Sequence, residues 1–334
     1  MKNTERIIPT VWISERAGFD NLIEAFINKG IKEIRINCTR HSINEYKKEI
    51  YKFQEKNGAN LDLLIDVPIP KKKVRIFYDW NGNEKKLVNN KVYRILRKED
   101  PNKQAQDIFV DDDDYYALQK IPNQSELLIG ENCAKVKIES TAVDEIYVRC
   151  VTGGTVAYGK YITSPEMRFA NCSENIVKSY IDLANSTSCK SIALSFVENA
   201  EEVNWIRNML KGNTKIISKI ETIEGVKNIN EIINASDGIM IARGDLLINV
   251  GYELFAKSCN DIVMACEKYK KKYYFATGIF ESYSIDRKIP SRSELCELFN
   301  ILKYTSASVI LEYNKCKTSS QAIDVLDIIE GVIV

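Results

Sequence analysis

Short apolar runs of β-prone residues alternate with helix-like stretches along most of this chain of 334 residues. Continuous apolar runs fit strands that are buried on both faces of a parallel sheet, and the stretches between them have the spacing of amphipathic helices. Eight such runs occur, and they begin at Ile7, Ile31, Leu61, Ser191, Lys215, Gly238, Tyr273 and Ser308. Eight parallel strands that alternate with helices close into a (β/α)8 barrel, so we expect an α/β fold of this type.

A different pattern interrupts the alternation after the third run. Across residues 68–165, short alternating β runs are separated by turn signals such as Asn81-Gly82 and Gly153-Gly154. We therefore predict a (β/α)8 TIM barrel domain made of residues 1–67 and 166–334. The segment between them is predicted to be an inserted, small all-β lid domain with a barrel-like sheet.

Composition excludes several classes of protein. A formal net charge of +1 argues against a broadly basic nucleic-acid surface, and no apolar run approaches the ~20 residues that span a bilayer. The amino terminus lacks the apolar region of a signal peptide, which favours a cytoplasmic location. The nine cysteines form no CxxC pair, so we interpret them as reduced thiols, and the single histidine, His41, excludes a His-rich metal site. The acidic run Asp111 to Asp114 is interpreted as a solvated turn of the insert.

Three charged residues stand out around two consecutive predicted strands. Successive side chains of a strand point to opposite faces, so Lys219 and Glu221 must share one side of the segment 215–221. Asp245 closely follows the next apolar strand. Such a Lys–Glu pair taken alone is most often a surface pair, but charges in buried barrel strands collect at the carboxyl ends, where barrel enzymes keep their chemistry. One ammonium and two carboxylates at one barrel mouth would suit a divalent cation.

Several short motifs follow one another in a characteristic order. They are Arg35-Ile36-Asn37-Cys38-Thr39, Asp66, Val151-Thr152-Gly153-Gly154, Ser195-Phe196, SKIE at 218–221, EGV at 224–226, SDGIMIARGDL at 236–246, FAT at 275–277 and IPSRSE at 289–294. In this order they resemble the pyruvate kinase family over nearly the whole chain. The family's regulatory carboxyl-terminal domain has no counterpart in the sequence.

The resemblance implies a phosphotransferase that acts on phosphoenolpyruvate, or a related enol phosphate, with Mg2+ or Mn2+. Lys219 matches the lysine that neutralises the transferring phosphoryl group, and Glu221 and Asp245 match the carboxylates that hold the divalent ion. Gly244 and Asp245 match the turn at a helix amino terminus that receives the substrate carboxylate. Thr277 matches the threonine near the enolate carbon, where a hydroxyl can deliver a proton.

Further matches concern the phosphate groups and the nucleotide. Arg35 resembles the arginine that touches the transferred phosphate. The arginine of the family's G-P-x-I-R motif falls on Lys73 without a gap, or on Arg75 with a short insertion. The resemblance therefore implies small-molecule substrates that include ADP or ATP, with no nucleic-acid or membrane partner, and it leaves a homo-oligomer open.

The implied monovalent cation site is incomplete in this sequence. Asn37, Thr39 and Asp66 resemble the oxygen ligands of K+. The family follows its aspartate with a threonine and a lysine, whereas this chain has Val67 and Pro68. One ligand of K+ is therefore missing.

The other departures also fall on the nucleotide side. Arg40 replaces the histidine after the R-x-N-x-S motif, and the family's S-E-K-D motif reads Ser173-Glu174-Asn175-Ile176. Two alternatives to the kinase therefore stay open. One is a metal-dependent 2-oxo-acid lyase, or another enolate enzyme, that uses no nucleotide. The other is a catalytically weak paralogue that binds a ligand.

Overall fold

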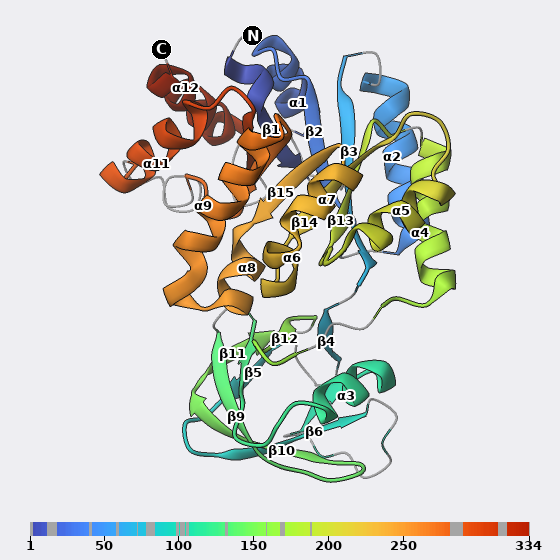
Figure 1. The fold of residues 1–334 in the computed structure, drawn as a ribbon, viewed down its shortest axis with the longest axis vertical. Coiled ribbons are helices and arrows are strands. Elements are labelled where there is room, and N and C mark those ends of the chain that lie inside the picture. The colour runs from blue at the N-terminus through green and yellow to red at the C-terminus, as the bar shows by residue number, and fades with distance from the viewer. Residues whose placement is uncertain are drawn as a thin grey trace. The chain divides into compact units, whose positions relative to one another are not determined.

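The protein is described from a computed structural model. The described residues are 3–11, 19–39, 42–57, 60–71, 73–77, 84–97, 100, 104, 107–130, 133–157, 159–167, 171–187, 189–280, 290–312 and 319–333. The chain divides into two compact units (Figure 1). Unit 1 consists of Met1–Pro70, Cys172–Leu247 and Glu253–Val334, and unit 2 consists of Lys71–Asn171 and Ile248–Tyr252.

Unit 1 contains a closed barrel of eight strands, all paired in parallel, in the order β1-β17-β16-β15-β14-β13-β3-β2. The strands are β1 (Ile7–Val11), β2 (Glu33–Asn37), β3 (Asp62–Pro70), β13 (Ser191–Ser195), β14 (Lys215–Ile220), β15 (Gly238–Ala242), β16 (Lys272–Ala276) and β17 (Ala307–Glu312). They lie at the eight predicted positions. The predicted α/β fold class with a (β/α)8 barrel is confirmed.

The barrel strands are apolar because both of their faces are buried. One buried cluster takes side chains from seven strands and consists of Ile8, Leu64, Ala193, Ile217, Met240, Tyr274, Ala276 and Ile310. Filled layers of this kind make a TIM barrel a packed core and leave its chemistry to the strand ends. The polar residues of the strand ends therefore need a separate explanation.

A 3-10 helix, η1 (Asn3–Arg6), precedes the first strand, and α-helices then alternate with the strands as the sequence predicts. The α-helices are α1 (Phe19–Asn28), α2 (Ile43–Asn57), α4 (Glu174–Thr187), α5 (Ala200–Met209), α6 (Ile223–Lys227), α7 (Ile229–Ala235), α8 (Arg243–Val250), α9 (Tyr252–Lys268), α11 (Arg292–Leu302) and α12 (Ser319–Ile333). The local sequence fixes where several of these helices begin. Ser291 and Glu294, for example, form a capping box at the start of α11. Within the described ranges, no helix is both long enough and apolar enough to cross a membrane.

Unit 2 is built on a second closed sheet of seven strands, in the order β10-β6-β7-β4-β12-β8-β9. Its strands are β4 (Val74–Phe77), β6 (Val92–Arg97), β7 (Ile108–Val110), β8 (Glu126–Ile129), β9 (Ala134–Thr141), β10 (Ile146–Thr152) and β12 (Tyr161–Thr163), and β5 (Glu84–Leu87) pairs separately with β11 (Gly154–Ala157).

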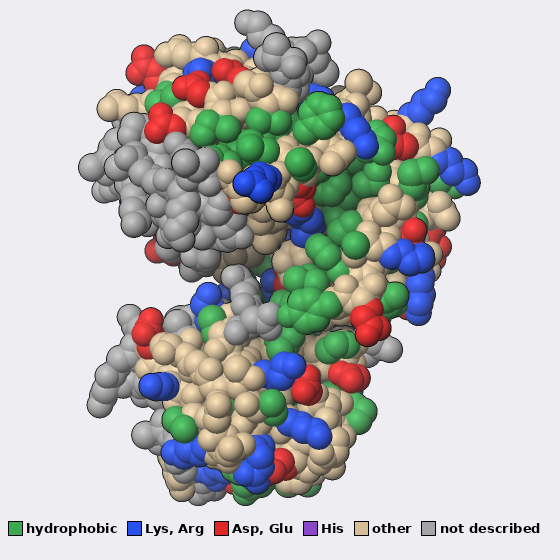
Figure 2. Space-filling model, turned by 90° about the vertical axis from the view of Figure 1, so that its left-hand side faces the viewer, with side chains coloured by type: hydrophobic (Ala, Val, Ile, Leu, Met, Phe, Trp, Pro, Cys, Tyr) green, Lys and Arg blue, Asp and Glu red, His purple; other side chains and the backbone are tan. Residues whose placement is uncertain are grey.

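Figure 2 shows basic and acidic side chains interspersed on the face in view, in keeping with the formal net charge of +1.

One prediction for the insert is wrong. The acidic run forms the start of a helix, α3 (Asp112–Gln119), instead of a solvated turn. Carboxylates are favourable in a first helical turn because they oppose the positive end of the helix dipole. Asp114 is buried, and its carboxylate accepts a hydrogen bond of 3.0 Å from the backbone N–H of Arg75. Unit 2 is therefore mainly, but not wholly, β.

Candidate functional site

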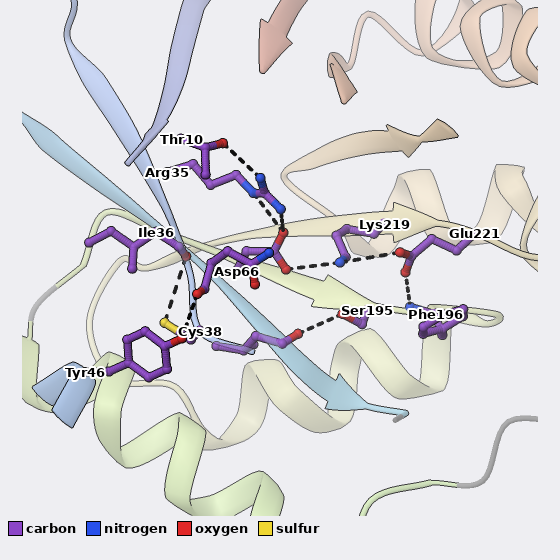
Figure 3. A network of polar contacts seen from close by, with 12 residues as sticks. Thr10, Arg35, Ile36, Cys38, Tyr46, Asp66, Ser195, Phe196, Lys219 and Glu221 are labelled. Atoms are coloured by element: carbon purple, nitrogen blue, oxygen red, sulfur yellow. Dashed lines mark hydrogen bonds and ion pairs between the residues drawn. The ribbon is translucent and has the colours of Figure 1, made fainter. Parts of the chain in front are cut away.

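Four charged side chains form one network (Figure 3). Three of them lie on the barrel strands β2, β3 and β14, and the fourth, Glu221, directly follows β14. Arg35 on β2 donates from Nε and Nη2 to Oδ2 of Asp66 on β3, at 2.9 and 2.7 Å. Nζ of Lys219, on β14, lies 3.1 Å from Oδ1 of Asp66 and 3.5 Å from Oε1 of Glu221. Two cations and two anions thus balance one another.

The network is almost wholly removed from water. The exposed fractions are 7% for Arg35, 1% for Asp66, 8% for Lys219 and 1% for Glu221. Burial disfavours the charged form of Lys219, but the carboxylates of Asp66 and Glu221 outweigh burial and raise its pKa. Burial likewise opposes ionisation of Asp66, yet Lys219 and Arg35 lower its pKa. Lys219 and Glu221 are therefore not the exposed pair that their spacing alone would suggest.

The turn after β13 fixes the second oxygen of Glu221. Oε2 of Glu221 accepts a hydrogen bond of 2.6 Å from the backbone N–H of Phe196. Phe196 is buried and has a φ of +54°, which is uncommon for a residue other than glycine. The preceding residue, Ser195, donates from Oγ to the carbonyl oxygen of Val67 at 2.9 Å. Sequence reasoning missed this positioning by Phe196, although the Ser195-Phe196 motif marked the place.

Helix α8 begins directly after β15 and carries Gly244 and Asp245 in its first turn. Asp245 is half-buried, and its charge adds to those of Asp66 and Glu221 in raising the pKa of Lys219 against burial. A Cβ atom on Gly244 would lie 3.0 Å from Cγ2 of Thr277, so glycine permits a close approach here. The structure thus brings Asp245 near Lys219 and Gly244 against Thr277.

Thr277 follows β16 and has a φ of +71°. Its carbonyl oxygen accepts a hydrogen bond of 2.9 Å from Nε of Arg243 and a second bond from Nη2. Nη1 of Arg243 is paired with Glu297 on α11. Sequence reasoning missed Arg243 and Glu297. Arg243 lay within a quoted motif, but no local signal connects it with Glu297.

The predicted monovalent ligands lie on neighbouring strands. Asn37 and Asp66 are register partners of β2 and β3. Oδ1 of Asn37 is buried and has no hydrogen-bond partner among the described residues. Thr39 follows β2 and is half-buried. The carboxylate of Asp66, by contrast, is already neutralised by Arg35 and Lys219.

Lys73 and Arg75, the two basic side chains predicted to lie near the nucleotide, belong to unit 2. Nζ of Lys73 lies 4.1 Å, and Cζ of Arg75 4.5 Å, from the ring centroid of Tyr161. Arg75 also donates from Nη2 to the hydroxyl of Tyr161 at 2.9 Å. The two cations therefore share one aromatic ring. Arg40 and His41 lie outside the described residues.

Across the ranges that the structure describes, no three His, Cys, Asp or Glu side chains are grouped so that they could hold a metal ion. A divalent site in the described barrel would therefore depend on Glu221 and Asp245, with water and substrate oxygens as further ligands.

Comparisons with known proteins agree on one family. The family model "Pyruvate kinase, barrel domain" matches residues 2–319. The pyruvate kinase of Methanocaldococcus jannaschii is 28% identical over 318 residues, which cover 94% of this chain and 66% of that protein. The pyruvate kinase of Thermotoga maritima is 27% identical over 311 residues, with 90% and 64% covered. The pyruvate kinase of Dictyostelium discoideum is 28% identical over 296 residues, with 85% and 57% covered. The chain thus spans less than two thirds of the length of these relatives.

Proposed function

Since this chain belongs to the pyruvate kinase family, we propose that it is a phosphotransferase that moves a phosphoryl group between phosphoenolpyruvate, or a related enol phosphate, and ADP. One observation carries the proposal. Lys219 is buried at the barrel mouth and stays charged because Asp66 and Glu221 surround it. A fixed cation in a site with little water is what the transfer of a phosphoryl group requires.

The proposed roles follow from this arrangement. The ammonium of Lys219 neutralises the charge that spreads over the phosphoryl oxygens in the transition state. Arg35 adds a second positive charge, and it also orients Asp66, because its Nε and Nη2 donate to that carboxylate. Its Nη1 donates to Oγ1 of Thr10 at 2.9 Å, so the guanidinium is fixed before substrate binds.

The carboxylates fit a divalent cation of the Mg2+ or Mn2+ type. Mg2+ in proteins commonly takes one or two carboxylates, and substrate oxygens and water complete its coordination. Glu221 and Asp245 supply that number, and Phe196 holds Glu221 in place. When bound, the ion would act as a Lewis acid toward the enolate and phosphate oxygens.

Two further residues are assigned to the enolate. The backbone N–H groups of Gly244 and Asp245, at the amino terminus of α8, receive the substrate carboxylate. The hydroxyl of Thr277 passes a proton to the enolate carbon and regains one from water. The contact between Gly244 and Thr277 supports a common site for these two tasks.

The remaining assignments complete the proposal. Oδ1 of Asn37, which has no hydrogen-bond partner within the described part of the chain, supports a weak K+ site with Thr39 and Asp66. Lys73 and Arg75, held on one ring, contact the phosphates of the nucleotide. Residues 68–165 act as the lid of the barrel formed by residues 1–67 and 166–334.

The test is a 31P NMR assay of phosphoenolpyruvate, ADP and Mg2+ with the complete chain. The proposal predicts ATP and pyruvate, and Glu221→Gln removes this activity. Glu33→Gln is the matched control, because Glu33 lies at the start of β2 and bonds Ser191 instead of the network. A wild-type chain that forms no ATP and binds no phosphoenolpyruvate would contradict the proposal.

A second candidate is an enolate enzyme that uses the same metal without a nucleotide. It is favoured by the departures on the nucleotide side, where Arg40 replaces the family's histidine and Asn175 stands where the family's S-E-K-D motif has a lysine. This candidate predicts Mg2+-dependent exchange of the methyl protons of pyruvate with solvent, at a rate that ADP does not change. An inert methyl group would exclude it.

A further inference from the structure

The backbone of Thr277 is in a conformation that its side chain disfavours. Its φ of +71° lies in the left-handed region, where a β-branched residue is a clear outlier. Such conformations cluster at functional sites and persist only where the surrounding structure enforces them. The structure must therefore contain groups that hold Thr277.

The main group is the guanidinium of Arg243. Nε donates to the carbonyl oxygen of Thr277 at 2.9 Å and, more weakly, to that of Ala276 at 3.4 Å. Nη2 donates to the same Thr277 oxygen. Two N–H groups of the planar guanidinium thus donate to one carbonyl oxygen. This restricts the orientation of the peptide bond that follows Thr277.

Glu297 in turn holds the guanidinium. It pairs with Nη1 of Arg243, and only 11% of the Arg243 side chain is exposed, against 40% of the Glu297 side chain. Glu297 lies on α11, whereas Arg243 is the first residue of α8. The Arg243–Glu297 pair therefore connects α8 with α11, and Arg243 links this pair to the carbonyl of Thr277 at the end of β16.

The other side of Thr277 is held by the neighbouring residue of α8. Cγ2 of Thr277 would be 3.0 Å from a Cβ atom at position 244, so the side chain packs directly on the Gly244 backbone. Arg243 and Gly244 therefore act on the two ends of Thr277, one on its carbonyl and one on its side chain.

We propose that Arg243, held by Glu297, is a positioning residue that fixes the left-handed backbone of Thr277 and so directs its hydroxyl toward the substrate. The inference rests on the proposed function, which gives Thr277 the proton-delivery role. Among the described residues, Arg243 makes its hydrogen bonds and ion pair with Ala276, Thr277 and Glu297, and none with the charge network or a predicted metal ligand. Its loss should therefore affect proton delivery and leave metal binding intact.

The test compares Arg243→Met and Glu297→Gln with the matched control Arg207→Met. Arg207 also bonds a carbonyl and a carboxylate, those of Ala235 at 2.9 Å and Asp237 at 2.8 Å, but it acts at the amino-terminal end of β15. A small misplacement of a reacting group can lower a rate by about 10²-fold. Arg243→Met should lower kcat for pyruvate formation by about that factor, with little change in KM or in the affinity for Mg2+. Glu297→Gln should give a smaller loss, and Arg207→Met none.

A second measurement does not depend on activity. A crystal structure of the Arg243→Met variant should show residue 277 outside the left-handed region. The inference is overturned if residue 277 keeps its positive φ, or if Arg243→Met retains the kcat of Arg207→Met. If the wild-type chain has no activity, the proposed function fails, and the crystal structure alone still decides whether Arg243 positions Thr277.

Discussion

Replacing Asp66 by asparagine removes the central anion of the buried network with almost no change in shape. Asp66 lies 2.7 Å from Nη2 of Arg35 and 3.1 Å from Nζ of Lys219. With an effective dielectric constant of about 20, each pair attracts by about 5 to 6 kcal/mol, most of which offsets the cost of burying the charges. Removing one partner leaves the others uncompensated and costs about 3 to 5 kcal/mol. Because asparagine keeps an acceptor oxygen, we expect a loss of about 3 kcal/mol.

Urea unfolding at neutral pH, followed by circular dichroism, measures this loss as a shift in midpoint at constant slope. Asp62→Asn is the matched control. Asp62 lies on the same strand and pairs with Lys190, but the side chains are 40% and 49% exposed. An exposed pair contributes about 0 to 1 kcal/mol, so this control should change little. If Asp66→Asn costs no more stability than Asp62→Asn, the buried charge of Asp66 does not stabilise the network.

The other predictions concern pH, a close contact and the cation. Asp66 has a lowered pKa in the folded state, so its stabilisation is complete above the unfolded value of about 3.9 and is lost as the pH falls through the lower folded pKa. The stability difference between the wild-type chain and Asp66→Asn should therefore be constant from neutral pH to about pH 5 and disappear in stronger acid, as urea midpoints across this range would show. Gly244→Ala should displace Thr277 and lower kcat by about tenfold or more, whereas Gly331→Ala, which meets nothing within 4 Å, should leave kcat unchanged. Lys219→Met should lower kcat for pyruvate formation by about 10²- to 10³-fold, and a loss below about tenfold would remove Lys219 from the mechanism.

Much of the barrel could be predicted from the sequence because its signals are local. Each strand is buried on both faces, so it is a continuous apolar run that any segment-by-segment reading detects. The common face of Lys219 and Glu221 follows from the two-residue repeat of a strand. The order of the family motifs predicts a role for each of these residues without any knowledge of their contacts.

The contacts that complete the site depend on the fold and could not be predicted in this way. Lys219 reaches Asp66 across β13, since β14 and β3 are not neighbours in the barrel. Arg243 and Glu297 are 54 residues apart and meet only because α8 and α11 come together at the end of β16. Nothing in either local sequence indicates that contact.

Calorimetry with oxalate, a stable planar mimic of the enolate, tests whether Glu221 and Asp245 form a metal site. If Glu221 and Asp245 bind a divalent ion beside a fixed ammonium at the barrel mouth, oxalate should bind the wild-type chain and Glu33→Gln only when Mg2+ is present. Glu221→Gln should abolish this binding. Oxalate binding that needs no Mg2+, or that survives in Glu221→Gln, would contradict a metal site formed by Glu221 and Asp245.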